Sequence, residues 1–222
     1  MSGPATIARL YRYPVKGLSP EEVAGATLTP GQTLPADRRY AIENGPTGFD
    51  PAAPAYFPKI RFLMLMRDER LAGLRTRFDE TSNVLTVRRD GAVAVQGDLE
   101  TAPGRAAIER FFANEFAAEL RGPPKVLSAP GHSFSDVAAK VVSIINLASV
   151  AAIEGVVGQT VDPLRFRANL YVSGWPAWHE FDLLGHIPHA LTQAFGHSDC
   201  GVYAQVLTGG DIAAGDAITI PD

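Results

Sequence analysis

Lys16 is the residue whose type and position most readily suggest chemistry. It follows Pro14-Val15 and precedes Gly17, so its ammonium can project from a turn whose backbone N–H groups are also free. An ammonium and backbone N–H groups at one turn can bind a phosphate. Four arginines could add planar guanidinium groups to the same anion: Arg38 or Arg39, and Arg165 or Arg167.

The same basic residues also fit a simpler interpretation. Lysine and arginine are common on exposed strand edges, where their charges stay in water. Taken one at a time, the residues favour this interpretation. Only their convergence in one pocket would favour a phosphate site, and their spacing along the chain does not show such a pocket.

Cys200 is the single cysteine and the only soft ligand for a transition metal such as molybdenum. Three histidines could join its thiolate around zinc: His186, His189 and His197. Their spacing matches no standard zinc pattern, so we expect surface or capping histidines and a small, buried cysteine side chain. The sequence also lacks the Walker, dinucleotide-binding, nucleophile-elbow and paired-histidine zinc motifs.

Short strands separated by Gly and Pro must position these residues. Apolar runs predict strands over 7–11, 22–28, 39–43, 60–67, 84–88, 92–96, 140–145, 165–172, 202–208 and 212–220. The last two are expected to form a closing hairpin, and Asp90-Gly91 predicts a tight hairpin between 84–88 and 92–96. Many short strands with turn residues between them favour a barrel or a sandwich.

Three helices complete the predicted pattern. Apolar residues at helical spacing cover 104–120, and a short helix over 147–156 has Asn146 as its N-cap. A third helix is predicted over 187–195. Residues 43–58 predict a surface loop, and Gly122-Pro123-Pro124 is the best candidate domain boundary. The chain is therefore expected to be mainly β with a few helices (α+β).

Composition and charge exclude several classes of protein. A chain of 222 residues with 46% hydrophobic and 20% charged residues is typical of a folded soluble protein. The formal net charge of −4 argues against a broad basic surface for nucleic acid. One cysteine allows no intrachain disulfide, and the sequence shows neither a signal-peptide pattern nor an apolar run of membrane length. We therefore expect a cytoplasmic protein with no nucleic-acid and no membrane partner.

Several segments, in order along the chain, resemble the MOSC family. Tyr13-Pro14-Val15-Lys16-Gly17 and Asp37-Arg38-Arg39 are similar to the opening of the N-terminal β-barrel domain that precedes a MOSC domain. Residues 142–150 resemble the entry to the MOSC domain itself, and Phe166-Arg167-Ala168-Asn169 resembles its Phe-Arg-Pro-Asn strand. Gly201-Val202-Tyr203-Ala204 is similar to its last hairpin.

The resemblance implies an N-terminal β-barrel-like domain over residues 1–122, followed by a MOSC β-barrel domain over 123–222. It also implies a molybdenum cofactor (molybdopterin) held between the two. By this likeness, Lys16 and Arg38 hold the phosphate of the pterin from the N-terminal side, and Arg167 reaches it from the MOSC side. Asn146 and Ser149 would supply polar contacts, while Asn169 would help to fix its strand or touch the pterin.

Two departures from the family pattern matter. Relatives often have a serine after the lysine, where this chain has Gly17, so one hydroxyl donor is lost. Relatives also carry a strand pair, with an Arg-Cys whose cysteine meets the molybdenum, where this chain has only Gly185 and His186 between Leu184 and Ile187. The pair was left out of the sequence, was deleted, or is naturally missing. We favour omission, because the sequence shows no compensation elsewhere for lost core strands.

The resemblance implies two alternative functions. As an enzyme, the protein would be a molybdenum-dependent oxidoreductase that reduces N-oxygenated compounds, with a small-molecule substrate and an electron-transfer partner protein. As a binding module, it would be a carrier of sulfur or of the molybdenum cofactor, without redox turnover. A third interpretation is a barrel with no cofactor, in which Lys16, Arg38 and Arg167 are solvated charges.

Overall fold

The computed structural model describes residues 4–184 and 200–220 and divides the chain into two compact units. Unit 1 combines three segments: Met1–Tyr11, Glu22–Pro35 and Val141–Asp222. Unit 2 combines two: Arg12–Glu21 and Ala36–Lys140. The described residues are mainly β, as the sequence predicts, and contain two α-helices. The boundary predicted at residue 122 does not coincide with the division between these units, because unit 2 continues to Lys140. As a boundary between two domains along the sequence it stays a prediction.

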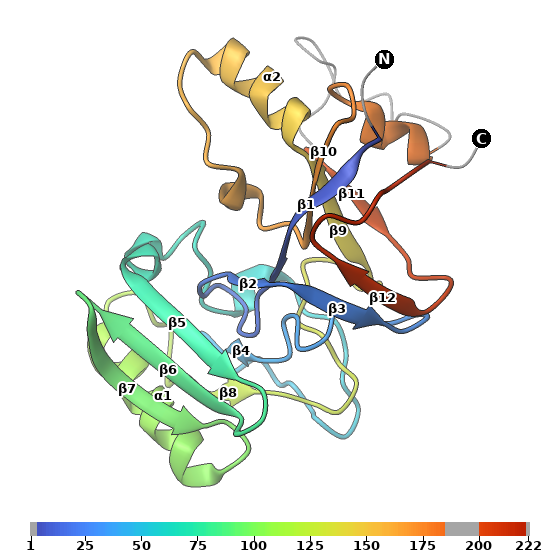
Figure 1. Ribbon diagram of the computed structural model, residues 1–222. Helices are drawn as coiled ribbons and strands as arrows, with labels where there is room; N and C mark the ends of the chain where they lie inside the picture. The colour runs from blue at the N-terminus through green and yellow to red at the C-terminus, as the bar shows by residue number, and fades with distance from the viewer. Residues whose placement is uncertain (1–3, 185–199, 221–222) are drawn as a thin grey trace. The chain divides into compact units, whose positions relative to one another are not determined.

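A five-stranded sheet in the order β11-β9-β10-β1-β2 forms the centre of unit 1 (Figure 1). Its strands are β1 (Thr6–Arg12), β2 (Glu21–Val23), β9 (Val142–Asn146), β10 (Leu170–Ser173) and β11 (Val202–Ala204). β9 and β10 run parallel, so the chain must cross over between them, and α2 (Leu147–Val157) lies within that crossover. A second sheet of unit 1 pairs β3 (Gly25–Leu28) with β12 (Gly210–Ala213).

The start of α2 follows directly from its sequence. The side chain of Asn146 accepts a hydrogen bond from the N–H of Ala148 at 3.1 Å, which satisfies one of the free donors of the first turn. The helix ends at Gly158, which adopts the left-handed conformation at φ 69° that a C-terminal glycine favours. The predicted helix over 147–156 and its cap are therefore confirmed.

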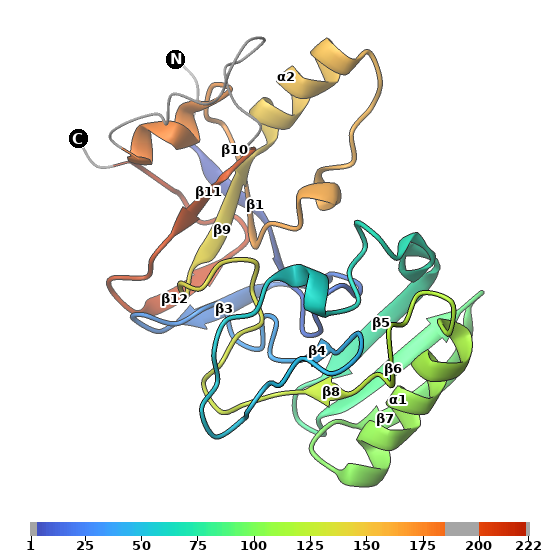
Figure 2. The same cartoon turned by 180° about the vertical axis from the view of Figure 1, so that it is seen from behind.

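Unit 2 contains a three-stranded antiparallel sheet of β5 (Leu74–Asp79), β6 (Val84–Arg89) and β7 (Ala92–Asp98), covered on one face by α1 (Ala102–Glu115) (Figures 1 and 2). A separate two-stranded antiparallel sheet of unit 2 pairs β4 (Ala41–Ile42) with β8 (Val126–Leu127). The β6–β7 hairpin turns at Asp90 (φ 51°) and Gly91 (φ 81°), both left-handed as a two-residue hairpin of this type requires. The predicted hairpin is confirmed.

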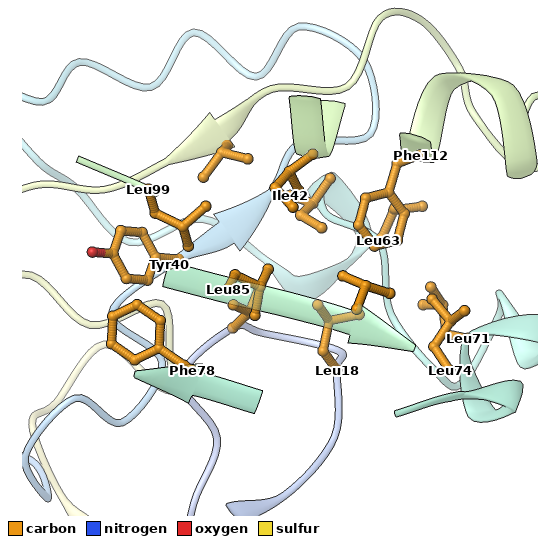
Figure 3. Packing of buried hydrophobic residues seen from close by; sticks show 14 of the residues in the cluster. Leu18, Tyr40, Ile42, Leu63, Leu71, Leu74, Phe78, Leu85, Leu99 and Phe112 are labelled. Carbon is orange, nitrogen blue, oxygen red and sulfur yellow. The ribbon is translucent and has the colours of Figure 1, made fainter. Parts of the chain in front are cut away.

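The apolar core of unit 2 lies between this sheet, α1 and the Lys16 turn. Figure 3 shows Leu18, Tyr40, Leu85 and Phe112 directed into the same cluster. At the start of α1 the backbone of the helix approaches β7 very closely, because a Cβ on Gly104 would lie 2.0 Å from the Asp98 carbonyl oxygen. Only glycine allows this approach.

Three strand predictions are wrong. Residues 60–67 are buried at Phe62 and Leu63, but they form the end of the 3₁₀ helix η1 (Lys59–Arg61) and the turns before the 3₁₀ helix η2 (Glu69–Gly73). Phe62 makes only an isolated bridge with Glu43, next to the two-residue strand β4, so no strand ladder continues along them. The predicted strand over 165–172 begins only at Leu170, after the 3₁₀ helix η3 (Pro163–Phe166). The predicted closing hairpin is absent from the described residues, since β11 pairs with β9 and β12 pairs with β3.

The predicted barrel is likewise not found among the strands that the structure describes. They form four sheets of five, two, two and three strands, and none of these closes on itself. β5 had no clear sequence signal and was not predicted. The predicted helix over 187–195, the interval between Leu184 and Ile187, and the three clustered histidines lie outside the described residues. No helix in the described part is both long and apolar enough to cross a membrane.

Candidate functional site

Lys16 is a buried lysine in unit 2, with 5% of its surface exposed. Its Nζ donates hydrogen bonds to the carbonyl oxygens of Phe134 at 2.9 Å and Ser135 at 3.2 Å, and to the carboxylate of Asp136. Its backbone N–H donates to the Tyr40 carbonyl oxygen at 2.8 Å, so this N–H is not free for an anion. The ammonium, and not the N–H of Lys16, is therefore the group of this residue that could meet an anion.

Arg38 belongs to the same region of unit 2. Its guanidinium donates to the carboxylate of Asp37 at 2.5 Å and lies 4.6 Å from the ring centroid of Tyr13. Its backbone is left-handed, at φ 49°. Arg39 is directed elsewhere, because it pairs with Glu100 at 2.9 Å. Between the two arginines that the sequence offered, Arg38 is the one close to Lys16.

The carboxylate of Asp136 is the point on which these charges act together. Burial alone would raise the pKa of Asp136, but its attraction to Lys16 and their hydrogen bond lower it, and the charges of Arg38 and Lys59 add to this effect. Three cations thus stabilise one negative charge, as they would stabilise a bound anion. The structure thus places Lys16 and Arg38 near one carboxylate, while their shared binding of a phosphate stays a prediction.

The geometry of the turn explains why this chain has Gly17 where relatives often have serine. Its φ is 81°, and a Cβ at this position would lie 2.5 Å from the Leu63 carbonyl oxygen. Any side chain, including the hydroxymethyl of serine, would force the backbone of this turn or of Leu63 to move. The turn that carries Lys16 is therefore built for glycine.

In unit 1, Asn146 and Ser149 form a buried network around Glu180. Asn146 Nδ2 donates to the Pro176 carbonyl oxygen at 2.6 Å and to Glu180 Oε2 at 3.1 Å, and the Ser149 hydroxyl donates to the same Oε2 at 2.9 Å. All three side chains are fully buried. Glu180 Oε1 has no hydrogen-bond partner in the structure. This network ties the segment before and within η4 (His179–Leu184) to the start of α2.

Asn169 connects the three central strands of unit 1. Its Oδ1 accepts from the hydroxyl of Ser143 at 2.9 Å, and its Nδ2 donates to the Tyr11 carbonyl oxygen at 3.1 Å. Ser143 lies on β9 and Tyr11 on β1, the two neighbours of β10. Asn169 is therefore placed to fix its strand, one of the two roles that the resemblance implies.

Arg167 lies at the end of η3 and not on a strand. It is left-handed, at φ 54°, and its N–H closes the 3₁₀ turn by donating to the Leu164 carbonyl oxygen at 3.1 Å. Its side chain is half-buried, whereas that of Arg165 is exposed. Of the two arginines in this tight turn, Arg167 is therefore the less exposed.

Cys200 is half-buried, and burial together with the charge of Glu180 raises its pKa to about 12. The thiolate needed to bind a soft metal is therefore disfavoured at neutral pH. In the described part of the chain, no three His, Cys, Asp or Glu residues are arranged to hold a metal ion. The described site residues thus provide cationic side chains and a buried polar network, but no metal cage.

A comparison with protein families decides the affiliation of the chain. The model of the MOSC N-terminal beta barrel domain matches residues 4–122, which is more than half of the 222 residues. The chain belongs to this MOSC N-terminal family. No curated protein matches it. The family resemblance read from the sequence is confirmed.

Lys16, Gly17 and Arg38 lie within the residues that match the MOSC N-terminal domain, and the other four predicted site residues lie beyond it. Asn146, Ser149, Arg167 and Asn169 belong to unit 1 and the first group to unit 2. Convergence of the two groups on one cofactor stays a prediction. Sequence reasoning missed Asp136 and Glu180, because isolated acidic residues outside any motif give no signal of the charges they will meet.

Proposed function

We propose that this MOSC N-terminal family protein binds a molybdenum–pterin cofactor, with Lys16 and Arg38 holding the phosphate of the pterin. One observation carries the proposal: the buried ammonium of Lys16, the guanidinium of Arg38 and the charge of Lys59 all act on one carboxylate, that of Asp136. A phosphate needs several charge-assisted donors in a partly dry place, and these groups supply them.

The residues present fit the phosphate part of the cofactor better than its metal part. Lysine and arginine are the usual phosphate-binding cations. For molybdenum a thiolate would be the natural protein ligand, and the raised pKa of Cys200 opposes its ionisation. We therefore assign no metal ligand and no catalytic residue among the described residues.

Bound cofactor would supply the redox chemistry, and reduction of N-oxygenated compounds is the activity that we propose for it. In this proposal Lys16 and Arg38 anchor the phosphate, and Arg167 is a further candidate cation for it. Asn146, Ser149 and Asn169 are positioning residues: their hydrogen bonds hold the start of α2 and the centre of the β9-β10-β1 sheet in place.

The test is cofactor retention. Full-length wild type and variants are purified from cells that make the cofactor, and molybdenum and pterin are measured per polypeptide. In Lys16→Ala and in Arg167→Ala, the molybdenum and the pterin per polypeptide should each fall by about tenfold or more, because each variant loses one charge-assisted contact to the phosphate. The matched controls Arg39→Ala and Arg165→Ala should retain the wild-type amount. Unchanged retention in Lys16→Ala and Arg167→Ala would refute the assigned phosphate site.

A carrier of the cofactor without redox turnover is the second candidate function, because the raised pKa of Cys200 leaves the molybdenum without a thiolate ligand among the described residues. The same raised pKa opposes a carrier of sulfur, which would need a nucleophilic thiolate. Reduction of an amidoxime or N-hydroxylated base by a reduced dye separates the two. Turnover by the cofactor-loaded wild type would support the oxidoreductase. A full cofactor load without turnover would support the carrier.

A further inference from the structure

We propose that the carboxylate of Asp136 occupies the position of the bound phosphate, so that a phosphate ligand enters this site by displacing it. The inference rests on the proposed anion-binding role of Lys16 and Arg38, and it adds how that site is kept filled and opened. It concerns residues of unit 2 alone.

The first argument is the difference in exposure between the two partners. The side chain of Lys16 is 6% exposed, whereas that of Asp136 is 52% exposed. The lysine thus forms the floor of the site, and the aspartate covers it from the solvent side. An anion that arrives from solvent meets the Asp136 carboxylate before it meets the ammonium.

The second argument is that the Asp136 loop is anchored without its carboxylate. The N–H of Phe134 donates to the Arg38 carbonyl oxygen at 2.8 Å, and the Ser133 hydroxyl donates to the Asp37 carbonyl oxygen at 3.1 Å. The Lys16 ammonium also holds two carbonyl oxygens of this loop. The carboxylate can therefore swing away by side-chain rotation while the backbone stays in place.

Two further hydrogen bonds hold the backbone at and beside Asp136. The hydroxyl of Tyr56 donates to the backbone carbonyl oxygen of Asp136 at 3.1 Å, and the Ser135 hydroxyl donates to the Val137 carbonyl oxygen at 2.7 Å. Both contacts involve backbone oxygens and leave the Asp136 carboxylate uninvolved. The Asp136 carboxylate is the replaceable partner, because it is a side chain that can rotate toward solvent.

The charges favour an exchange of anions rather than simple loss of the carboxylate. Lys16, Arg38 and Lys59 bring three positive charges to the cluster, and Asp37 and Asp136 bring two negative ones. With Asp136 turned away, the cluster keeps an excess of two positive charges. A phosphate monoester or inorganic phosphate carries up to two negative charges near neutral pH and would balance that excess. The chemistry therefore selects a phosphate dianion over a neutral ligand.

The test measures binding of inorganic phosphate to cofactor-free, full-length protein by titration calorimetry at fixed ionic strength. Asp136→Asn keeps the shape of the side chain and removes its charge. It should bind phosphate roughly fivefold to tenfold more tightly than wild type, because the competing anion is gone. Asp79→Asn, which neutralises a carboxylate at the end of β5, is the control and should bind like wild type. The double variant Lys16→Ala/Asp136→Asn should lose the gain.

An unchanged or weaker affinity in folded Asp136→Asn would overturn the proposal. If Asp136→Asn does not fold, Asp136→Ser is used instead; failure of both to fold would also overturn it, because the loop must keep its place without the carboxylate. If Asp136→Asn binds phosphate more tightly but the protein never acquires molybdenum or pterin, this inference holds and the proposed function is contradicted. A protein that acquires molybdenum and pterin, but whose Asp136→Asn variant binds phosphate no more tightly than wild type, would support the proposed function and overturn this inference.

Discussion

Cys200 is the residue on which thiolate chemistry in the described part of the chain would depend. Since burial and the charge of Glu180 raise its pKa to about 12, the side chain is a neutral thiol at pH 8. Its thiolate fraction is then roughly a thousandfold below that of an ordinary cysteine. We predict that iodoacetamide alkylates Cys200 at least about 100-fold more slowly in the native than in the urea-unfolded protein, as followed by mass spectrometry. Similar rates would show that the thiol ionises readily.

Asn146 combines a helix cap with two further hydrogen bonds, to Pro176 and Glu180. Asn146→Ala should therefore lower the free energy of unfolding by roughly 2–4 kcal/mol, because buried polar partners lose their hydrogen bonds as well as the helix losing its cap. Asp162→Ala is the matched control in the same unit. Asp162 caps η3 through one exposed hydrogen bond at 2.9 Å, so its loss should cost about 1 kcal/mol or less.

Both variants are compared by urea denaturation followed by tryptophan fluorescence. The two tryptophans of the chain, Trp175 and Trp178, lie in unit 1 beside the network. Equal effects of the two substitutions would mean that Asn146 acts as a cap and nothing more.

At the scale of elements, the turn that carries Lys16 depends on Gly17. Gly17 and Gly91 have the same φ of 81°. A Cβ at Gly17 would clash with the Leu63 carbonyl oxygen, whereas a Cβ at Gly91 would have no atom within 4 Å. Gly91→Ala should cost only backbone strain, about 1 kcal/mol. Gly17→Ala should cost roughly 3 kcal/mol or more, because the packed backbone of Leu63 must also move.

The pair is measured by urea denaturation followed by circular dichroism, since both glycines lie in unit 2. A difference below about 1 kcal/mol would show that the Lys16 turn is more adaptable than its close contact suggests. In that case a serine at position 17, as in relatives, would also be tolerated.

Elements whose signals are local could be predicted from the sequence, and elements that depend on distant partners could not. Asn146 and Gly158 bound α2, and Asp90-Gly91 sets the hairpin, because each acts on the backbone beside it. The partners of β11 and β12 are β9 and β3, far away in the chain, and hydrophobic alternation says nothing of such pairings. Phe62 and Leu63, within the strand predicted over 60–67, are buried, but burial alone does not distinguish a strand from packed turns.

For the whole molecule, each compact unit is assembled from separated segments of the chain. β1 lies within the matched family domain, yet its partner β10 lies beyond residue 122. The sequence could therefore supply the family and the basic residues, while the division into units and the Asp136 carboxylate required the folded structure. The sequence also suggests that the turn at Lys16 offers free backbone N–H groups to a phosphate, whereas the N–H of Lys16 is engaged with Tyr40.

The central claim is that this chain holds a molybdenum–pterin cofactor. Native mass spectrometry of the intact protein, purified from cells that make the cofactor, tests it most directly. We predict a folded species heavier than the polypeptide by the mass of one cofactor, which returns to the bare polypeptide mass on denaturation, with molybdenum and pterin released together. A folded protein that shows only the mass of the polypeptide, with neither molybdenum nor pterin, would contradict the claim.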